Sequence, residues 1–220
     1  MPIKPDREYR NMTIQTREPE EGEEARKIVT GYASTFEEPY RLYGWDGVEV
    51  WEVVDRGAFD DTDMSDVIMQ YDHAGRVFAR TRNNTLAVDV DDHGLRIEAD
   101  LGGTEIGREL FDEISGGYTD RMSFGFTVTG ESEETKKLES GVTRYTRHIT
   151  AIGKLYDVSA VSIPANDGTE IGADAASRSI RNFSDGVIAK IQAERLEAEK
   201  LETERRRAEV RVKALLGGNK

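Results

Sequence analysis

The sequence of 220 residues contains no cysteine, only three histidines and no long apolar run. The absence of cysteine excludes disulfide bonds, a thiolate nucleophile and a cysteine-ligated zinc site. No apolar segment approaches the ~18 to 20 residues of a membrane span, and the N-terminus lacks the hydrophobic stretch of a signal peptide. We therefore expect a cytosolic protein with no membrane partner, in which only His73, His93 or His148 can supply an imidazole base.

Basic charge is also scarce, because 30 Lys and Arg residues face 43 Asp and Glu residues and leave a net charge of −13. Nucleic-acid affinity rests mainly on Lys and Arg displacing counterions, so no nucleic-acid partner is expected, although a local basic patch stays open. Asp60, Asp61, Asp63 and Asp66 lack the spacing and turn glycine of a calcium loop and are more typical of a solvated loop. Glycine-rich phosphate loops are missing as well. We expect neither a metal nor a cofactor.

The N-terminal residues differ in composition from the rest of the chain. Residues 1–26 are almost all polar or charged, which predicts a flexible arm that cannot bury enough surface to offset its ordering entropy. From Lys27 onward, short runs rich in β-branched and aromatic residues predict strands. Residues 86–101 alternate with period two around a turn, which predicts a hairpin with Gly94 at positive φ.

One helix interrupts these strands. Apolar residues recur at helical spacing between Thr104 and Gly117, with Thr104 as N-cap and Gly116 as stop signal. Strand patterns return over 122–128, 144–152 and 155–164. About eight strands with one main helix predict a mainly β, α+β fold in which residues 27–172 form a closed or nearly closed antiparallel β-barrel.

The C-terminal part is charged and helical. Residues 173–186 are small and polar and are interpreted as a linker, although the helical pattern itself begins near Ser179. Residues 187–220 form a tail whose apolar seam has heptad-like spacing with polar breaks at Glu194 and Arg205. A long amphipathic charged helix is predicted rather than a strong coiled coil.

Three residues are candidates for chemistry. His73 ends the apolar run 67–71, whereas His93 lies in a hairpin turn and His148 on the polar face of a strand, positions typical of solvated residues. A structural histidine stays the alternative for His73. Ser123 lies opposite the apolar face of 122–128, with Gly125 clearing space beside its hydroxyl; an ordinary serine next to a bulge is the alternative.

Asp157 lies in a strand whose neighbours are nearly all apolar or small. A carboxylate there must be paired or hydrogen-bonded, because an unpaired buried charge costs several kcal/mol. An imidazole is a natural partner, and a structural salt bridge to an arginine is the competing interpretation.

Six short motifs occur in order along the chain. They are Gly31-Tyr32-Ala33-Ser34-Thr35-Phe36, Arg56-Gly57-Ala58-Phe59, Tyr71-Asp72-His73, Asp92-His93-Gly94-Leu95, Ser123-Phe124-Gly125-Phe126, and the run from Leu155 to Asn166 that contains Asp157. This series resembles the prohead maturation proteases of tailed bacteriophages, the caudovirus prohead serine protease family, which is distantly similar in fold to herpesvirus assemblin. The resemblance covers about residues 28–172.

The resemblance implies a serine endopeptidase built on a β-barrel surrounded by helices. His73 would be the base, Ser123 the nucleophile and Asp157 the group that orients the histidine. In the herpesvirus relatives a second histidine takes the place of Asp157, and Ala74 stands where the phage family often has an acid or amide. No residues after Asp157 match the herpesvirus arginine pair, so the oxyanion donors stay unassigned.

The resemblance also implies where and on what the protein acts. The site would be the assembling procapsid in the host cytoplasm, and the substrates would be scaffold, the scaffold segment of the major capsid protein precursor, and the protease itself. The portal is a further candidate partner, and self-association is expected. A non-enzymatic capsid assembly module is the rival interpretation, followed by an unrelated intracellular hydrolase. A protease needs His73 near both Ser123 and Asp157.

Overall fold

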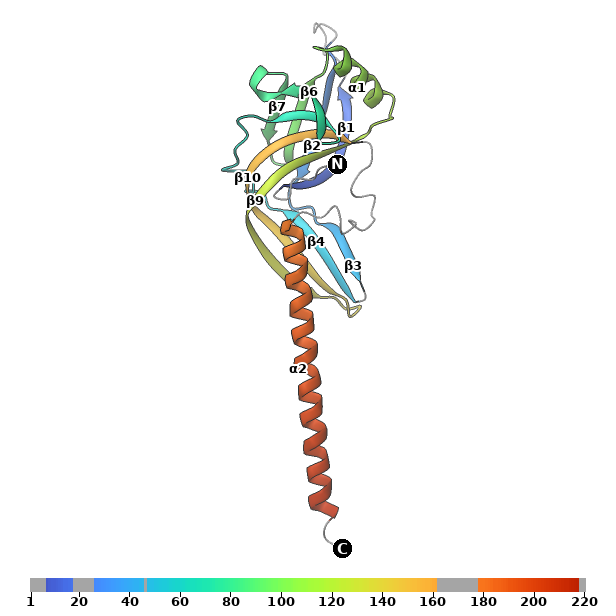
Figure 1. The fold of residues 1–220 in the computed structure, drawn as a ribbon, viewed down its shortest axis with the longest axis vertical. Coiled ribbons are helices and arrows are strands. Elements are labelled where there is room, and N and C mark those ends of the chain that lie inside the picture. Colours follow the sequence, from blue (N-terminus) through green and yellow to red (C-terminus); the bar gives the residue numbers. More distant parts are fainter. Residues whose placement is uncertain (1–6, 18–25, 46, 162–177, 218–220) are drawn as a thin grey trace. The chain divides into compact units, whose positions relative to one another are not determined.

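The computed structural model describes residues 7–17, 26–45, 47–161 and 178–217. The chain divides into two units, Met1–Ser179 and Ile180–Lys220. Up to Val161, the described residues of the first unit hold one sheet and one α-helix, drawn in Figure 1. Its elements are β1 (Glu8–Arg17), β2 (Ile28–Thr35), β3 (Tyr40–Trp45), β4 (Val48–Val54), β5 (Ile68–Tyr71), β6 (Ala74–Arg80), the 3₁₀ helix η1 (Thr81–Asn83), β7 (Leu86–Val90), β8 (Gly94–Asp100), α1 (Glu105–Ser115), β9 (Arg121–Lys137) and β10 (Thr143–Val161).

The ten strands form an open, mixed sheet, which corrects the prediction of a closed or nearly closed antiparallel barrel. Its main path runs β3-β4-β10-β9-β1-β2-β8-β7, while β5 joins β10 and β6 joins β5. Both β4 and β5 run parallel to β10. Because β10 is 19 residues long, it carries one parallel partner at each end, and the sheet branches. Among the described strands, no ladder joins β6 to β7, so the sheet stays open there.

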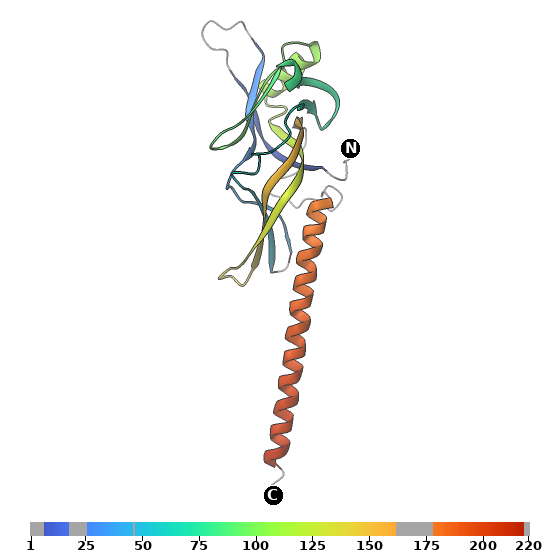
Figure 2. The same cartoon turned by 90° about the vertical axis from the view of Figure 1, so that its left-hand side faces the viewer.

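Strands β9 and β10 form the longest pair of the sheet. The C-terminal end of β9 and the N-terminal end of β10 run beside β3 and β4 (Figure 2). The sequence predicted two separate strands where β10 is continuous. The alternation is interrupted around Gly153, and the ladder accommodates the interruption by register shifts between Ile149 and Asp157. A bulge adds a residue to one strand without ending the pairing, so one strand survives a break in the pattern.

The core lies on one face of β9 and β10, as the alternation predicted. Met122, Phe124 and Phe126 are at most 1% exposed, and they belong to the same cluster as Leu155 and Val158. Each such side chain stabilises the fold by roughly 1.5–3 kcal/mol on burial. This burial fixes the strand register, since a one-residue slip would turn the apolar side chains to the other face.

The predicted helix and hairpin are confirmed. Helix α1 begins after Thr104, whose side chain accepts a hydrogen bond from the Gly107 amide at 3.1 Å, and ends at Gly116. Strands β7 and β8 pair as expected, but Gly94 does not have positive φ. A β-carbon on Gly94 would collide with the backbone oxygen of Ser34, so the glycine permits close approach of two strands instead.

The prediction of a flexible arm over residues 1–26 is wrong for residues 8–17. These residues form β1, which lies between β2 and β9. The polar composition misled the interpretation, because Glu8 and Arg10 are themselves buried, at 1% and 4% exposure. They belong to a buried ionic cluster with Glu52 of β4 and Arg147 of β10. Strand β1 is thus held by ion pairs as well as by its ladders.

The buried ionic cluster is densely connected. Arg10 donates to both oxygens of Glu52, at 2.5 and 2.6 Å, and Arg147 donates to Glu8 and Glu52, each at 2.8 Å. Burial lowers the pKa of Arg10, but the negative charges of Glu52 and Glu8 outweigh burial and hold that pKa well above its ordinary value. Both arginines therefore stay charged, and each buried charge has a partner of opposite sign.

The second unit contains α2 (Arg178–Gly217), a helix of 40 residues, from Ile180 onward. The helix confirms the predicted start near Ser179, whereas the predicted linker 173–186 is wrong from residue 178 onward; residues 173–177 lie outside the described part. The predicted helical tail, residues 187–220, is helical as far as residue 217, and residues 218–220 lie outside the described part. Within the described ranges, no helix is long and apolar enough to cross a membrane. Several apolar side chains of α2 are exposed, among them Leu201 at 69% and Val210 at 66%.

Candidate active site

His73 lies in the tight turn that joins β5 to β6. Tyr71 and Ala74 pair across this hairpin, and the two residues between them, Asp72 and His73, have φ angles of 49° and 54°. Two consecutive left-handed residues are the geometry of a type I′ turn, but a side chain in this region costs roughly 1–2 kcal/mol per residue. The turn is anchored by the Asp72 amide, which donates to the Ala160 carbonyl at 2.8 Å. Such strain is common at functional sites.

Asp157 is the hydrogen-bond partner of His73. The Nδ1 atom of His73 is hydrogen-bonded to Oδ1 of Asp157, which is 2% exposed. Ser159 Oγ donates to the same oxygen at 2.8 Å, and Nη1 of Arg7 lies 3.8 Å from Oδ2. The sequence left an imidazole and an arginine as alternative partners of this carboxylate, and the structure provides both. The buried charge is therefore fully partnered.

Ser123 shares the face of the sheet on which Asp157 lies. Ser123 pairs directly with Ser159, and Asp157 pairs with Gly125, so the side chains of Ser123 and Asp157 are diagonal neighbours. Diagonal neighbours in an antiparallel pair are typically ~7–8 Å apart, which leaves room for one imidazole between them. Ser123 is 1% exposed, and its Oγ has no hydrogen-bond partner among the described residues.

The structure thus brings together part of the predicted site. The contact between His73 and Asp157 is formed, and Ser123 lies on the same face, but the Ser123 hydroxyl is not bonded to the imidazole. Catalytic hydrogen bonds are often long or unformed in the absence of substrate.

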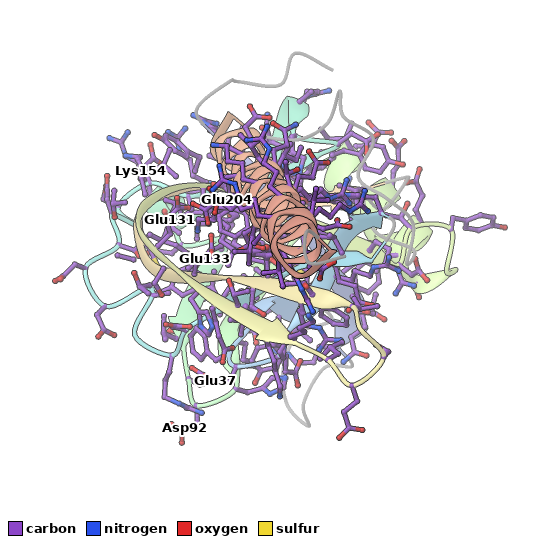
Figure 3. All side chains as sticks on the ribbon, turned by 90° about the horizontal axis from the view of Figure 1, so that it is seen from below. Glu37, Asp92, Glu131, Glu133, Lys154 and Glu204 are labelled. Atoms are coloured by element: carbon purple, nitrogen blue, oxygen red, sulfur yellow. The ribbon has the colours of Figure 1, made fainter. Side chains whose placement is uncertain are left out.

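The other two histidines have different surroundings. His93 is exposed in the β7–β8 turn, where its ring packs edge-on against Tyr32 at 4.4 Å, and its neighbour Asp92 projects from the edge of the molecule in Figure 3. His148 is 28% exposed and pairs with Asp55 at 2.9 Å. Both positions agree with the solvated positions that the sequence predicted for them.

Asp63 and Asp66, two of the acidic residues between β4 and β5, form ion pairs. Asp63 pairs with Lys154 at 2.6 Å, and hydrogen bonds from Lys154 and Ser65 lower the pKa of Asp63. Asp66 binds Arg80 through two hydrogen bonds, at 2.6 and 2.5 Å, and this guanidinium lowers the pKa of Asp66. These carboxylates hold the segment before β5 against β10 and β6.

Sequence reasoning missed two members of the site. Ser159 follows Asp157 by two residues, so strand alternation alone could have placed both side chains on one face. Arg7 carries no such signal. It belongs to the segment interpreted as a flexible arm, and only the pairing of β1 with β9 brings it to Asp157, where its guanidinium also lies 3.5 Å from the centre of the Tyr156 ring.

A histidine bonded through Nδ1 to a buried carboxylate, beside a buried serine, is an arrangement typical of serine hydrolases. A family model described as caudovirus prohead serine protease matches residues 12–185, a range that includes His73, Ser123 and Asp157. The chain belongs to this family. No curated protein and no solved structure matches it. Membership implies a serine peptidase of capsid maturation, with capsid-related partners and a location within the procapsid.

Proposed function

We propose that the protein is a prohead maturation endopeptidase that uses Ser123 as nucleophile, His73 as general base and Asp157 as the orienting acid. The observation that supports this assignment best is the hydrogen bond from His73 Nδ1 to Asp157 Oδ1, made on the face of the sheet that carries Ser123. Because Nδ1 binds Asp157, Nε2 is the ring nitrogen that would take the proton of the Ser123 hydroxyl.

In the proposed mechanism, Ser123 Oγ attacks the carbonyl carbon of the scissile peptide bond while His73 Nε2 takes its proton. The resulting imidazolium is stabilised by Asp157 and returns the proton to the leaving amine as the C–N bond breaks. Water then hydrolyses the acyl-enzyme with His73 again as base, which restores Ser123. Because Ser123 is buried, attack also requires the residues that cover its hydroxyl to move aside.

The proposed substrates are scaffold protein or the scaffold segment of the major capsid protein precursor, and the protease itself. Helix α2 suits recruitment into the prohead, because its exposed apolar side chains, such as Leu201 and Val212, recur along a helix that is otherwise highly charged. We propose that this helix docks on scaffold or capsid helices and that cleavage in the segment before it releases the enzyme.

The test is intact mass spectrometry of the wild type and of Ser123→Ala, each incubated alone and with assembled capsid precursor from the same source. We expect the wild type, and not Ser123→Ala, to shorten its own chain or the capsid precursor. Ser132→Ala is the matched control, because Ser132 lies on the exposed half of the same strand. Unchanged masses with the wild type would favour the rival function, a non-enzymatic assembly module.

A further inference from the structure

A groove of about 520 Å³ lies between the β5–β6 hairpin and α1. On the hairpin side it begins at Tyr71 and Ala74, the two residues that bracket the turn of His73. Its apolar lining comes from Tyr71, Phe78, Ile106 and Leu110. Apolar grooves with a few polar groups are the usual form of ligand sites in proteins. None of the predicted catalytic residues lines this groove, so it adds a surface next to the site already described.

The groove and the candidate nucleophile lie at the same end of the sheet. Strands β5 and β10 end at Tyr71 and Val161, and β9, antiparallel to both, begins at Arg121. Tyr71 pairs with Ala160, which pairs with Met122, the residue before Ser123. Two strand spacings of ~4.8 Å therefore separate the groove wall from the strand of Ser123, a span of about three extended residues.

Strand β6 offers backbone groups along this groove. It pairs only with β5 among the described strands, and it lies between β7 and α1 (Figure 1). Its first four residues are exposed, including Val77 at 41%. An unpaired edge of this kind can accept an extended peptide as an additional strand, with side chains at alternate positions entering neighbouring pockets.

The charges at the groove favour a basic side chain. Glu109 and Glu113 are exposed, lie one turn apart on α1 and line the groove together. Neither forms an ion pair with another described residue, and neither does Arg76 on the opposite wall. Like charges four residues apart on a helix repel each other, so a cation between them relieves that repulsion. An apolar floor below two carboxylates suits the aliphatic stem and charged head of Lys or Arg.

We propose that this groove binds a Lys or Arg side chain of the substrate polypeptide, within four residues of the bond that Ser123 attacks. The substrate segment lies extended along β6, and Glu109 and Glu113 bind its cationic head group. This inference rests on the proposed function and specifies its substrate class: extended segments with a basic residue at one fixed position beside the cut.

The test maps cut sites in two substrates, a mixed library of synthetic 14-residue peptides and the assembled capsid precursor. The enzymes are the wild type, Ser123→Ala, Glu109→Gln/Glu113→Gln and the control Glu105→Gln. This control alters an exposed acid of α1 outside the groove. The wild type and the control should show Lys or Arg enriched at one position within four residues of the cut. The double variant should lose this enrichment.

A matched pair of peptides, with Lys or uncharged norleucine at the enriched position, measures how strongly the enzyme prefers a basic side chain there. For the wild type, kcat/KM should be about tenfold or more higher with Lys, and the ratio should approach one in the double variant. Serine-dependent cutting without a basic preference, or a preference unchanged in the double variant, would overturn the groove assignment alone. Absence of Ser123-dependent cutting in both substrates would overturn the proposed function and this inference together.

Discussion

Ser159 Oγ donates a 2.8 Å hydrogen bond to Asp157 Oδ1, the oxygen that also binds His73 Nδ1. Both Ser159 and Asp157 are buried, at 0% and 2% exposure. The hydroxyl therefore fixes the rotation of the carboxylate about its side-chain bonds, and the carboxylate in turn fixes the imidazole. A residue that orients a catalytic base holds it in the productive geometry only when neighbouring residues fix its own side chain.

Replacement of Ser159 by alanine should slow the reaction without weakening substrate binding. The variant should show a kcat about tenfold lower with little change in KM, because one hydrogen bond to a charged group is removed from Asp157. Steady-state kinetics on one peptide checks the split. A rise in KM with unchanged kcat would contradict a positioning role, and Ser132→Ala provides the control for a serine of the same pair of strands that lies away from the site.

The three proposed catalytic residues should act as a unit. Ser123→Ala and His73→Ala should each lower kcat by ~10⁴-fold or more, and the double variant should be no slower than the slower single variant. Single-turnover assays with high enzyme concentration measure the residual rates. Multiplicative losses in the double variant would show that the two residues act independently, which the proposed mechanism does not allow.

The buried ionic cluster should dominate the stability of the sheet. Glu52→Ala removes the carboxylate shared by Arg10 and Arg147 and should lower the free energy of unfolding by about 3–5 kcal/mol, because two buried guanidinium groups lose a partner. The control is Glu49→Ala on the same strand. Glu49 pairs with Arg144 at a partly exposed position and should cost about 1 kcal/mol or less. Urea unfolding compares the two, and equal losses would contradict a special role for burial.

Acid should weaken the attachment of the segment before β5, because protonation of Asp66 disrupts its ion pair with Arg80. Hydrogen bonds from Arg80 lower the pKa of Asp66 in the folded state, so its contribution is complete above the unfolded value of about 3.9 and is lost as the pH falls through the lower folded value. The difference in unfolding free energy between the wild type and Asp66→Asn should be constant from pH 7 to 5 and shrink below pH 4. Urea unfolding at each pH measures it, and a difference independent of pH down to 2 would contradict the assignment.

Helix α2 should be needed for incorporation and not for chemistry. Residues from Ile180 onward form a unit separate from the sheet, so deletion of residues 180–220 should leave peptide hydrolysis intact while abolishing packaging into proheads. Gel analysis of purified proheads, with peptide cleavage measured on the same preparation, separates the two effects. Normal packaging of the shortened protein would contradict the recruitment role.

Hydrophobic periodicity predicted the elements whose packing follows from a local sequence pattern. Helix α1, the β7–β8 hairpin and the apolar face of β9 were all predicted, because their amphipathic spacing and capping residues are written in consecutive residues. His73 and Asp157 were likewise singled out, one as the end of an apolar run and the other as a charge in an apolar strand. The sequence left an imidazole or an arginine as the partner of Asp157, and the structure places both beside its carboxylate.

The remaining features depended on contacts between residues far apart in the chain. The polar sequence of β1 predicts a flexible arm by itself, and it becomes a central strand because Glu52 and Arg147, on other strands, neutralise Glu8 and Arg10. The branching of the sheet likewise follows from the two parallel partners of β10. The sequence by itself determined the candidate residues and the local elements, since these depend on neighbours within a few positions. Only the tertiary structure decided which charges could be buried, where the sheet stays open and which side chains surround Asp157, because each depends on a partner that local pattern cannot specify.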